Sequence, residues 1–190
     1  VLTVNPLNGK DVIGTIGIPV PSTEVVVMDE EGKKLPNGEP GEICARGPQV
    51  FQGYWERPEE TENVFFGDYF RTGDIGIQSD EGFFKIVDRK KDMILVSGFN
   101  VFPNEVEEVL MEHPKVLEVA CVGVPDEKST EAVKIFVVKR DKSLTEHELS
   151  TYCKENLTAY KKPKYIEFRE ELPKTNVGKI LRRVLKEETS

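Results

Sequence analysis

The fold is decided by the stretch DRKKDMILVSGFNVFPNEVE, residues 88–107, because the pattern of the chain changes within it. Before this stretch, residues 11–88 combine β-branched runs with the Gly, Pro and Asn that set turn dihedrals. After it, strand and helix patterns alternate. We therefore predict two units that meet at the charged segment VDRKKD, residues 87–92: a β-rich unit and a compact α+β domain of about 100 residues.

The first unit is divided by turns into short strands. The stretch STEVVVMDEEGKKLPNGEPGEICARG, residues 22–47, is typical of a hairpin with a long connection. Pro58 and the acidic residues after it favour the first turn of a short helix. Residues 70–91 predict strand, turn and strand, with SDEG at the turn. We expect Thr72, Gly73 and Asp74 to lie on a tight turn between two strands.

The second unit shows two helices among its strands. In FPNEVEEVLMEHP, residues 102–114, Pro103 suits a first turn and the apolar residues recur at helical spacing. In LTEHELSTYCKENL, residues 144–157, Thr145 and Glu148 have the spacing of a capping box. Strands are predicted before, between and after these helices, and a short helix follows the loop near the C-terminus.

Composition excludes several classes of protein. With 38% hydrophobic and 32% charged residues, the chain is typical of a globular protein, and its net charge of -8 argues against non-specific nucleic-acid binding. No apolar run approaches the roughly 18 residues of a membrane-spanning helix. Three cysteines without CxxC spacing indicate reduced thiols in a cytoplasmic protein, and no metal-ligand spacing is present. The chain begins at Val1 rather than Met, so we expect it to be part of something longer.

The stretch LPKTNVGKIL, residues 172–181, places Lys179 directly after Gly178. A phosphate-binding P-loop would need a glycine five residues before this Gly-Lys pair and a Ser or Thr after it. Those positions hold Pro173 and Ile180, so the P-loop interpretation fails at both. On this pattern alone, Lys179 would be a solvated loop lysine.

Two other positions offer chemistry but admit plainer interpretations. The Asp74 carboxylate could accept hydrogen bonds from two adjacent hydroxyls, as acidic residues do when they hold a ribose, or it could cap its own backbone in a turn. Gly98 could let a ligand approach the backbone closely, or it could be a simple turn glycine. A basic residue of the charged run could reach nucleotide oxygens, although such runs are usually solvated linkers.

Five segments in order change this interpretation: GTIGIPVPSTEV, GEICARGPQVFQGYW, FRTGDIG, DRKKDMILVSGFNVFPNEVE and LPKTNVGKILRR. Together they resemble the adenylate-forming acyl-CoA synthetases, and most closely the bacterial long-chain fatty acid–CoA ligases, over essentially the whole chain. The resemblance implies the last third of such an enzyme. Residues 1–88 would end the N-terminal AMP-binding domain, residues 89–91 would form a hinge, and residues 92–190 would be the mobile C-terminal α+β domain.

The resemblance also assigns roles to single residues. Asp74 matches the aspartate that holds the ribose hydroxyls, and Arg89 matches an arginine that contacts the nucleotide. Lys91 falls on the hinge position. Gly98 matches the glycine that lines the pantetheine tunnel, and Lys179 matches the catalytic lysine that reaches the acyl carboxylate and α-phosphate during adenylation.

The implied reaction joins a fatty acid to CoA through an acyl-adenylate, with ATP, Mg²⁺ and CoA as small-molecule partners and the Mg²⁺ site outside this chain. The missing N-terminal domain would be the main protein partner, and peripheral membrane association of the full-length enzyme is compatible with the resemblance. The chain alone is expected to be inactive. Two alternatives remain open: a ligase that loads a carrier protein, and a non-catalytic interaction module.

Two further features lie closer to ordinary surface and core roles. The segment YKKPKY presents Lys161, Lys162 and Lys164, which either meet CoA phosphates or are simply solvated. Tyr54 and Trp55, in the segment GYW, are expected to have packing roles.

Overall fold

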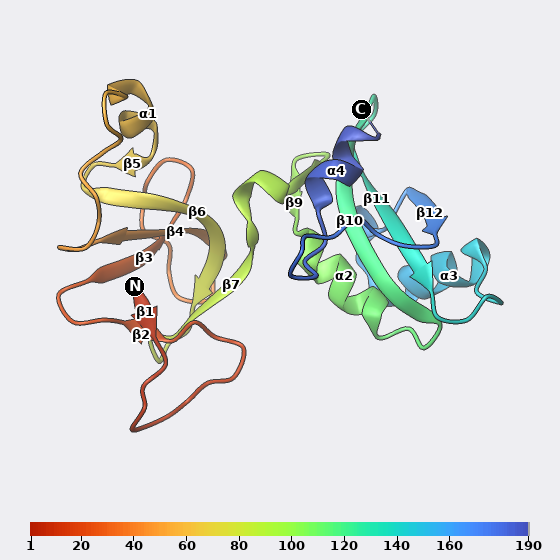
Figure 1. Cartoon of the computed structure of the whole chain (residues 1–190), viewed down its shortest axis with the longest axis horizontal. Coiled ribbons are helices and arrows are strands. Elements are labelled where there is room, and N and C mark those ends of the chain that lie inside the picture. Colours follow the sequence, from red (N-terminus) through yellow and green to blue (C-terminus); the bar gives the residue numbers. More distant parts are fainter. Residues whose placement is uncertain (190) are drawn as a thin grey trace. The chain divides into compact units, whose positions relative to one another are not determined.

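The computed structural model describes residues 1–189, which form two compact units, one over Val1–Lys91 and one that begins at Asp92. Each unit has its own sheet, as Figure 1 shows in red to yellow for the first unit and green to blue for the second. Each unit also buries its own apolar side chains. The α+β prediction is confirmed, and each unit can be described by itself.

The first unit is built on antiparallel pairing. Its elements are β1 (Thr3–Val4), β2 (Ile18–Pro19), β3 (Glu24–Met28), β4 (Gly41–Arg46), α1 (Pro58–Asn63), β5 (Phe65–Phe66), β6 (Tyr69–Gln78) and β7 (Phe84–Arg89). Within residues 1–91, β1 and β2 pair separately, while the larger sheet runs β3-β4-β6-β5 and β7 also pairs with β6. Val27, Ile43 and Phe84 lie at the centre of its core. The predicted hairpin, helix and strand pair are all confirmed.

The predicted turn at Thr72–Asp74 is wrong, because these three residues lie inside the continuous strand β6. On β4, Glu42 pairs with Ile75 and Cys44 pairs with Arg71, so the three residues lie opposite Ile43 alone. Gly73 takes a φ of +74°, a left-handed conformation that glycine adopts without steric cost. The glycine therefore marks a β-bulge rather than a chain reversal.

The second unit is a mixed sheet covered by helices. Its elements, counted from the turn at the boundary, are η1 (Lys90–Asp92), β8 (Ile94–Val96), β9 (Phe99–Val101), α2 (Pro103–Met111), β10 (Val116–Asp126), β11 (Thr130–Lys139), α3 (Glu146–Asn156), η2 (Ala159–Lys161), β12 (Tyr165–Arg169) and α4 (Arg182–Glu187). The strand order is β10-β11-β8-β9, with β12 parallel to β11.

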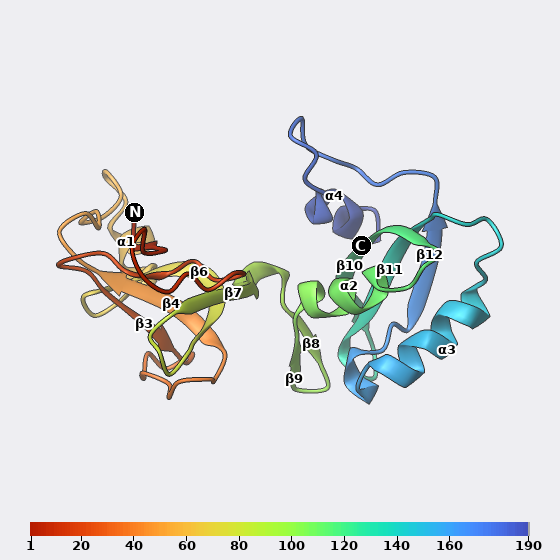
Figure 2. The same cartoon turned by 90° about the horizontal axis from the view of Figure 1, so that it is seen from below.

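Both faces of the β10–β11 pair are buried. Val119 and Ile135 belong to the cluster formed with α2 and α3, whereas Ala120 and Phe136 belong to a second cluster with Leu185 of α4. Because side chains alternate along a strand, neighbouring positions supply the two faces. Figure 2 shows α3 and α4 on opposite sides of these strands.

Both predicted helices are confirmed, and the predicted capping box is formed in part. Pro103 occupies the first turn of α2, whose Val106 and Leu110 are buried. Thr145 caps α3, since its hydroxyl accepts a hydrogen bond from the Glu148 N–H at 3.2 Å. The Glu148 carboxylate does not complete the capping box and instead pairs with Lys115. Across residues 1–189, no helix has the length and apolar character needed to cross a membrane.

All three cysteines are buried, as expected for small apolar side chains. Burial raises the pKa of the Cys44 thiol to about 12 and that of Cys153 to about 11. Both therefore remain protonated at neutral pH, which disfavours a nucleophilic role.

Leu110→Ala should lower the free energy of unfolding of the second unit by about 2–5 kcal/mol, because it empties a fully buried position on α2. Met111→Ala is the matched control on the same helix, since Met111 is 45% exposed, and it should cost below about 1 kcal/mol. Urea denaturation of both variants measures the difference. Equal losses would show that α2 does not supply the core as described.

Candidate functional site

Asp74 and Arg89 lie together in the first unit. They are paired positions on β6 and β7, and the Arg89 Nε lies 2.7 Å from Asp74 Oδ1. Asp74 is 22% exposed and Arg89 is 55% exposed, so solvent screens the pair and it contributes little to stability. A carboxylate accepts several hydrogen bonds at once, so Asp74 keeps the capacity to bind ligand hydroxyls beside a positive charge.

The bulge determines where the Asp74 carboxylate points. Thr72 Oγ1 donates to the Ile43 carbonyl at 2.7 Å and accepts from the Asp74 N–H at 3.1 Å. The hydroxyl thus satisfies the backbone of Asp74, while the carboxylate pairs with Arg89 rather than with its own backbone. A bulge commonly re-aims a side chain in this way.

A buried carboxylate, which the sequence did not single out, lies behind this bulge. Glu42 on β4 is 4% exposed and accepts hydrogen bonds from Arg71 Nη2 at 3.1 Å, Lys90 Nζ at 3.0 Å and the Gly73 N–H at 3.2 Å. In the sequence, GEICARG indicates a strand and forms part of a family segment, and neither interpretation singles out Glu42. The one signal that could have revealed Glu42 is an acidic residue next to the apolar run Ile43–Ala45.

Lys91 lies in η1, exposed to solvent, between two residues that have partners within their own units. Lys90 pairs with Glu42, and Asp92 lies 3.8 Å from Arg182. In the part of the chain that the structure describes, Lys91 itself has no ion pair. Its role as the hinge stays a prediction.

Gly98 lies at the tip of the β8–β9 hairpin. Ser97 and Gly98 have φ values of 50° and 86°, as in a type I′ turn of two residues. A Cβ at Gly98 would meet no atom within 4 Å, so the tip presents open backbone. Phe99 stacks on Tyr160 of η2, with ring centroids 4.7 Å apart, and this contact supports the hairpin from its side.

Lys179 lies on a closed loop between β12 and α4. Lys174 and Ile180 form an isolated bridge, and the Thr175 N–H donates to the Lys179 carbonyl at 2.8 Å. The Lys179 N–H donates to Thr175 Oγ1 at 3.1 Å, and Gly178 takes a φ of +82°. Within residues 1–189 the Lys179 ammonium has no ion-pair partner and is exposed. A defined turn therefore presents an unpaired positive charge.

The base of this loop is fixed by a residue that the sequence analysis also missed. Arg182, at the start of α4, hydrogen-bonds to Asn104 and to Glu107 of α2, with a distance of 2.9 Å from Arg182 Nε to Glu107 Oε1. The same carboxylate oxygen accepts from the Cys121 N–H at 2.8 Å. The loop thus joins a fixed base, and only its tip projects. In the sequence, Arg182 looked like one of several charges on a short helix.

The Gly98 hairpin and the Lys179 loop do not meet. Figure 2 shows the β8–β9 hairpin and the loop between β12 and α4 at opposite edges of the second unit. The unit therefore presents two separate functional candidates, one of bare backbone and one of positive charge.

The lysines of YKKPKY are mostly occupied. Lys161 Nζ lies 2.7 Å from Glu105 Oε2, and Lys164 pairs with Asp126. Lys164, with Ser129 and the Lys128 N–H, lowers the pKa of Asp126 to about 2, so this pair remains charged at neutral pH. Only Lys162 lacks an ion pair in the described part of this segment. Contact with CoA phosphates would compete with existing partners.

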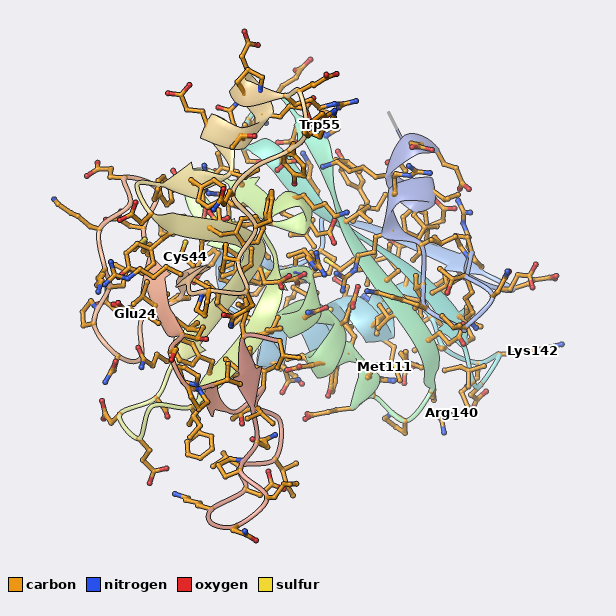
Figure 3. All side chains as sticks on the ribbon, turned by 60° about the vertical axis from the view of Figure 1, so that its left-hand side comes forward. Glu24, Cys44, Trp55, Met111, Arg140 and Lys142 are labelled. Carbon is orange, nitrogen blue, oxygen red and sulfur yellow. The ribbon has the colours of Figure 1, made fainter. Side chains whose placement is uncertain are left out.

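The aromatic residues of GYW divide between packing and exposure. Tyr54 contacts Phe51, with ring centroids 5.1 Å apart, but is 45% exposed, so its packing is partial. Trp55 is 87% exposed, so the prediction of a packing role is wrong for this residue. Figure 3 shows its side chain at the periphery of the unit, whereas Cys44 lies within the sheet.

Two family models match the chain. The AMP-binding enzyme model matches residues 1–55, and the model of the AMP-binding enzyme C-terminal domain matches residues 105–179. The long-chain-fatty-acid–CoA ligase of Escherichia coli O6:H1 is 58% identical over 187 residues, which is 98% of this chain and 33% of that protein. The enzyme of the same name from Bacillus subtilis is 50% identical over 95% of this chain and 32% of its own length. The chain thus spans about a third of these curated relatives.

Solved structures agree over the same region. ATP-bound MatB from Rhodopseudomonas palustris matches 98% of this chain and 38% of its own, with a TM-score of 0.91 and 36% identity. The o-succinylbenzoate CoA synthetase of Bacillus subtilis, in complex with its acyl-adenylate intermediate, matches 92% of this chain and 36% of its own, with a TM-score of 0.79 and 36% identity.

Gly98→Ala should lower the free energy of unfolding of the second unit by about 1–2 kcal/mol, because the left-handed conformation penalises a Cβ. The space is open, so the cost is conformational rather than steric. Gly98→Asn is the matched variant, and it should cost less because asparagine tolerates this region. Thermal and urea denaturation measure both, and equal effects would contradict the turn geometry.

Proposed function

The chain belongs to the AMP-binding enzyme family, and on this premise we propose that it forms the C-terminal third of an AMP-forming long-chain fatty acid–CoA ligase. The enzyme would convert a fatty acid, ATP and CoA into acyl-CoA, AMP and pyrophosphate. Identity of 58% to a ligase of that name, across 98% of this chain, supports the substrate class. The remaining catalytic parts would come from a region equivalent to the other two-thirds of those relatives.

In this proposal the two units have different tasks. Residues 1–88 complete the AMP-binding domain, residues 89–91 act as the hinge, and residues 92–190 form the mobile domain. Separate cores in the two units support this division, because each unit can move without exposing the interior of the other.

Adenylation would use Asp74, Arg89 and Lys179. The fatty acid carboxylate attacks the α-phosphorus of ATP, a new P–O bond forms, and pyrophosphate leaves. Asp74 accepts hydrogen bonds from the ribose hydroxyls while Arg89 contacts the nucleotide. Lys179 brings a positive charge to the oxygens on which negative charge accumulates, and such stabilisation is often worth several kcal/mol.

Thioester formation would need the second unit in another orientation. The CoA sulfur attacks the acyl carbon, and the bond to AMP breaks. Lys179 must then withdraw so that the pantetheine arm can enter beside the open backbone of Gly98. Because the two candidates lie on opposite edges of the same unit, rotation about Lys91 would exchange one for the other.

The support for ATP, Mg²⁺ and CoA as substrates or cofactors differs. Family membership and ATP-bound structural neighbours support the use of ATP. Mg²⁺ would bind to residues outside this chain and would supply positive charge that neutralises the phosphates. CoA would pass the Gly98 tip, while the lysines of YKKPKY are mostly engaged elsewhere. A cytoplasmic location, peripheral at a membrane, would suit a fatty acid substrate.

The observation that carries the proposal is the unpaired Lys179 ammonium. A cation on a closed turn with a fixed base costs little to present, and lysine acts as a compact point charge on a long stem. Its unit is distinct from the one that holds Asp74 and Arg89, as a two-step reaction with domain rotation requires.

Product analysis of the intact protein tests the function. Incubation with a long-chain fatty acid, ATP, Mg²⁺ and CoA should yield acyl-CoA, AMP and pyrophosphate. Acyl-AMP that forms without a thioester would indicate transfer to a carrier protein instead. Absence of ATP–pyrophosphate exchange in the intact protein would exclude both ligases and leave an interaction module. The 190-residue chain alone should show no exchange.

Lys179→Ala in the intact protein should slow acyl-adenylate formation by about 100- to 1,000-fold, since it removes the mobile charge. Thioester formation from supplied acyl-AMP should remain. ATP–pyrophosphate exchange and acyl-CoA release measure the two steps. Lys174→Ala, on the same loop but paired with Glu118, is the control and should retain both. Equal loss of both steps in Lys179→Ala would remove its specific role.

Lys91→Pro should produce the opposite result, because proline fixes φ at the residue about which the domain would turn. Adenylation should persist while thioester formation from acyl-AMP fails. Lys91→Ala leaves the backbone free and should support both steps. A proline variant that completes both steps at the normal rate would place the rotation elsewhere.

A further inference from the structure

Glu42 is an unusual residue for the centre of a small sheet. It lies on β4 beside Ile43, Cys44 and Ala45, all buried, and is itself almost inaccessible to solvent. Removing a carboxylate from water is costly unless charges and hydrogen bonds compensate for the lost hydration. Its partners therefore indicate why the position holds an acid.

The two carboxylate oxygens of Glu42 divide their partners. Oε1 accepts from the Gly73 N–H at 3.2 Å, whereas Oε2 accepts from Lys90 Nζ at 3.0 Å and from Arg71 Nε and Nη2 at 3.2 and 3.1 Å. The first contact holds the backbone of the bulge, and the second set holds two cations. Hydrogen bonds of this charged kind are roughly twice as strong as neutral ones.

These partners adjoin the residues proposed to act. Gly73 directly precedes Asp74, and Lys90 lies between Arg89 and Lys91. Asp74 and Arg89 face each other across β6 and β7. The Glu42 carboxylate on β4 therefore holds the backbone next to Asp74 and the side chain of Lys90, which lies between Arg89 and the hinge residue Lys91.

We propose that Glu42 is a positioning residue, which fixes the Asp74 bulge and the Lys90 anchor in one arrangement. This inference rests on the proposed function. Through Gly73, Glu42 would fix the geometry of Asp74 and Arg89, which would bind the nucleotide. Lys90 would be the fixed end of the hinge, so that rotation begins at the exposed Lys91. Glu42 touches no substrate and acts only through these neighbours.

Glu42→Gln is the informative variant. Its side chain keeps the shape of glutamate, and its amide oxygen can still accept one hydrogen bond, but the negative charge that holds Arg71 and Lys90 is lost. Hydrogen exchange of the intact protein should increase at residues 72–74 and 89–91. The KM for ATP in the exchange assay should rise about 10-fold, which is the effect expected from the loss of one charged hydrogen bond.

Glu24→Gln is the matched control. Glu24 on β3 also pairs with cations, Lys34 and Arg46, and Lys34 with Tyr69 lowers its pKa to about 2, but it contacts neither the bulge nor the hinge. This variant should leave both the hydrogen exchange at residues 72–74 and 89–91 and the KM for ATP unchanged.

Glu42→Gln with Lys90→Met separates positioning from stability. Removal of Lys90 should restore part of the lost melting temperature, because one cation, Arg71, rather than two is then left without its carboxylate. Exchange at residues 89–91 should remain fast and the KM for ATP should stay high. If the hydrogen exchange at residues 89–91 and the KM for ATP return to wild-type values together with the melting temperature, the proposal is overturned.

The remaining outcomes are equally decisive. Unchanged exchange at residues 72–74 and 89–91 in Glu42→Gln would overturn the proposal, as would an increase spread evenly over β3, β4 and β6. If the wild-type protein forms no acyl-adenylate, the proposed function fails, whereas the exchange measurement still decides whether Glu42 holds the two segments.

Discussion

The arrangement of the second unit depends on the burial of both faces of the β10–β11 pair. One face requires α2 and α3, and the other requires α4, so the chain must cross from one side of the sheet to the other after β12. The loop that carries Lys179 is part of this crossing. Leu172 and Leu185 anchor its two sides in the same apolar cluster, and Arg182 ties it to α2. Packing therefore fixes the base of the loop and leaves its tip in solvent.

The same sheet explains why the two candidates of this unit are far apart. The β8–β9 hairpin extends from the strand that pairs with β11, while the Lys179 loop emerges on the side covered by α4. In the proposed ligase, this unit would serve the two reaction steps by turning as a body. The charge and the open backbone are thus mutually exclusive at any one site, which is the property that a two-step ligase needs.

In the first unit, the main structural feature is the pairing of the Asp74 carboxylate with the Arg89 guanidinium. Strand pairing places Asp74 opposite Arg89, and the bulge re-aims the aspartate. Glu42 supplies charge behind both, at a position where an unpaired acid would be costly. The sequence does not single out these polar contacts, yet they are concentrated at β6 and β7, the two strands that would bind the nucleotide.

The sequence by itself determined the two-unit α+β organisation, the helices at Pro103 and Thr145, and the candidates Asp74, Arg89, Lys91, Gly98 and Lys179. The organisation and the helices depend on local periodicity and capping residues, which are visible along the chain. The candidate residues depend on the resemblance of five ordered segments to the acyl-CoA synthetases. Tertiary structure alone decided that Thr72–Asp74 is a bulge and that Trp55 is exposed. It also revealed Glu42 and Arg182, because their hydrogen-bond partners lie 29 to 78 residues away in sequence. Strand register and the pairing of buried charges arise only when distant segments meet, and no local pattern encodes them.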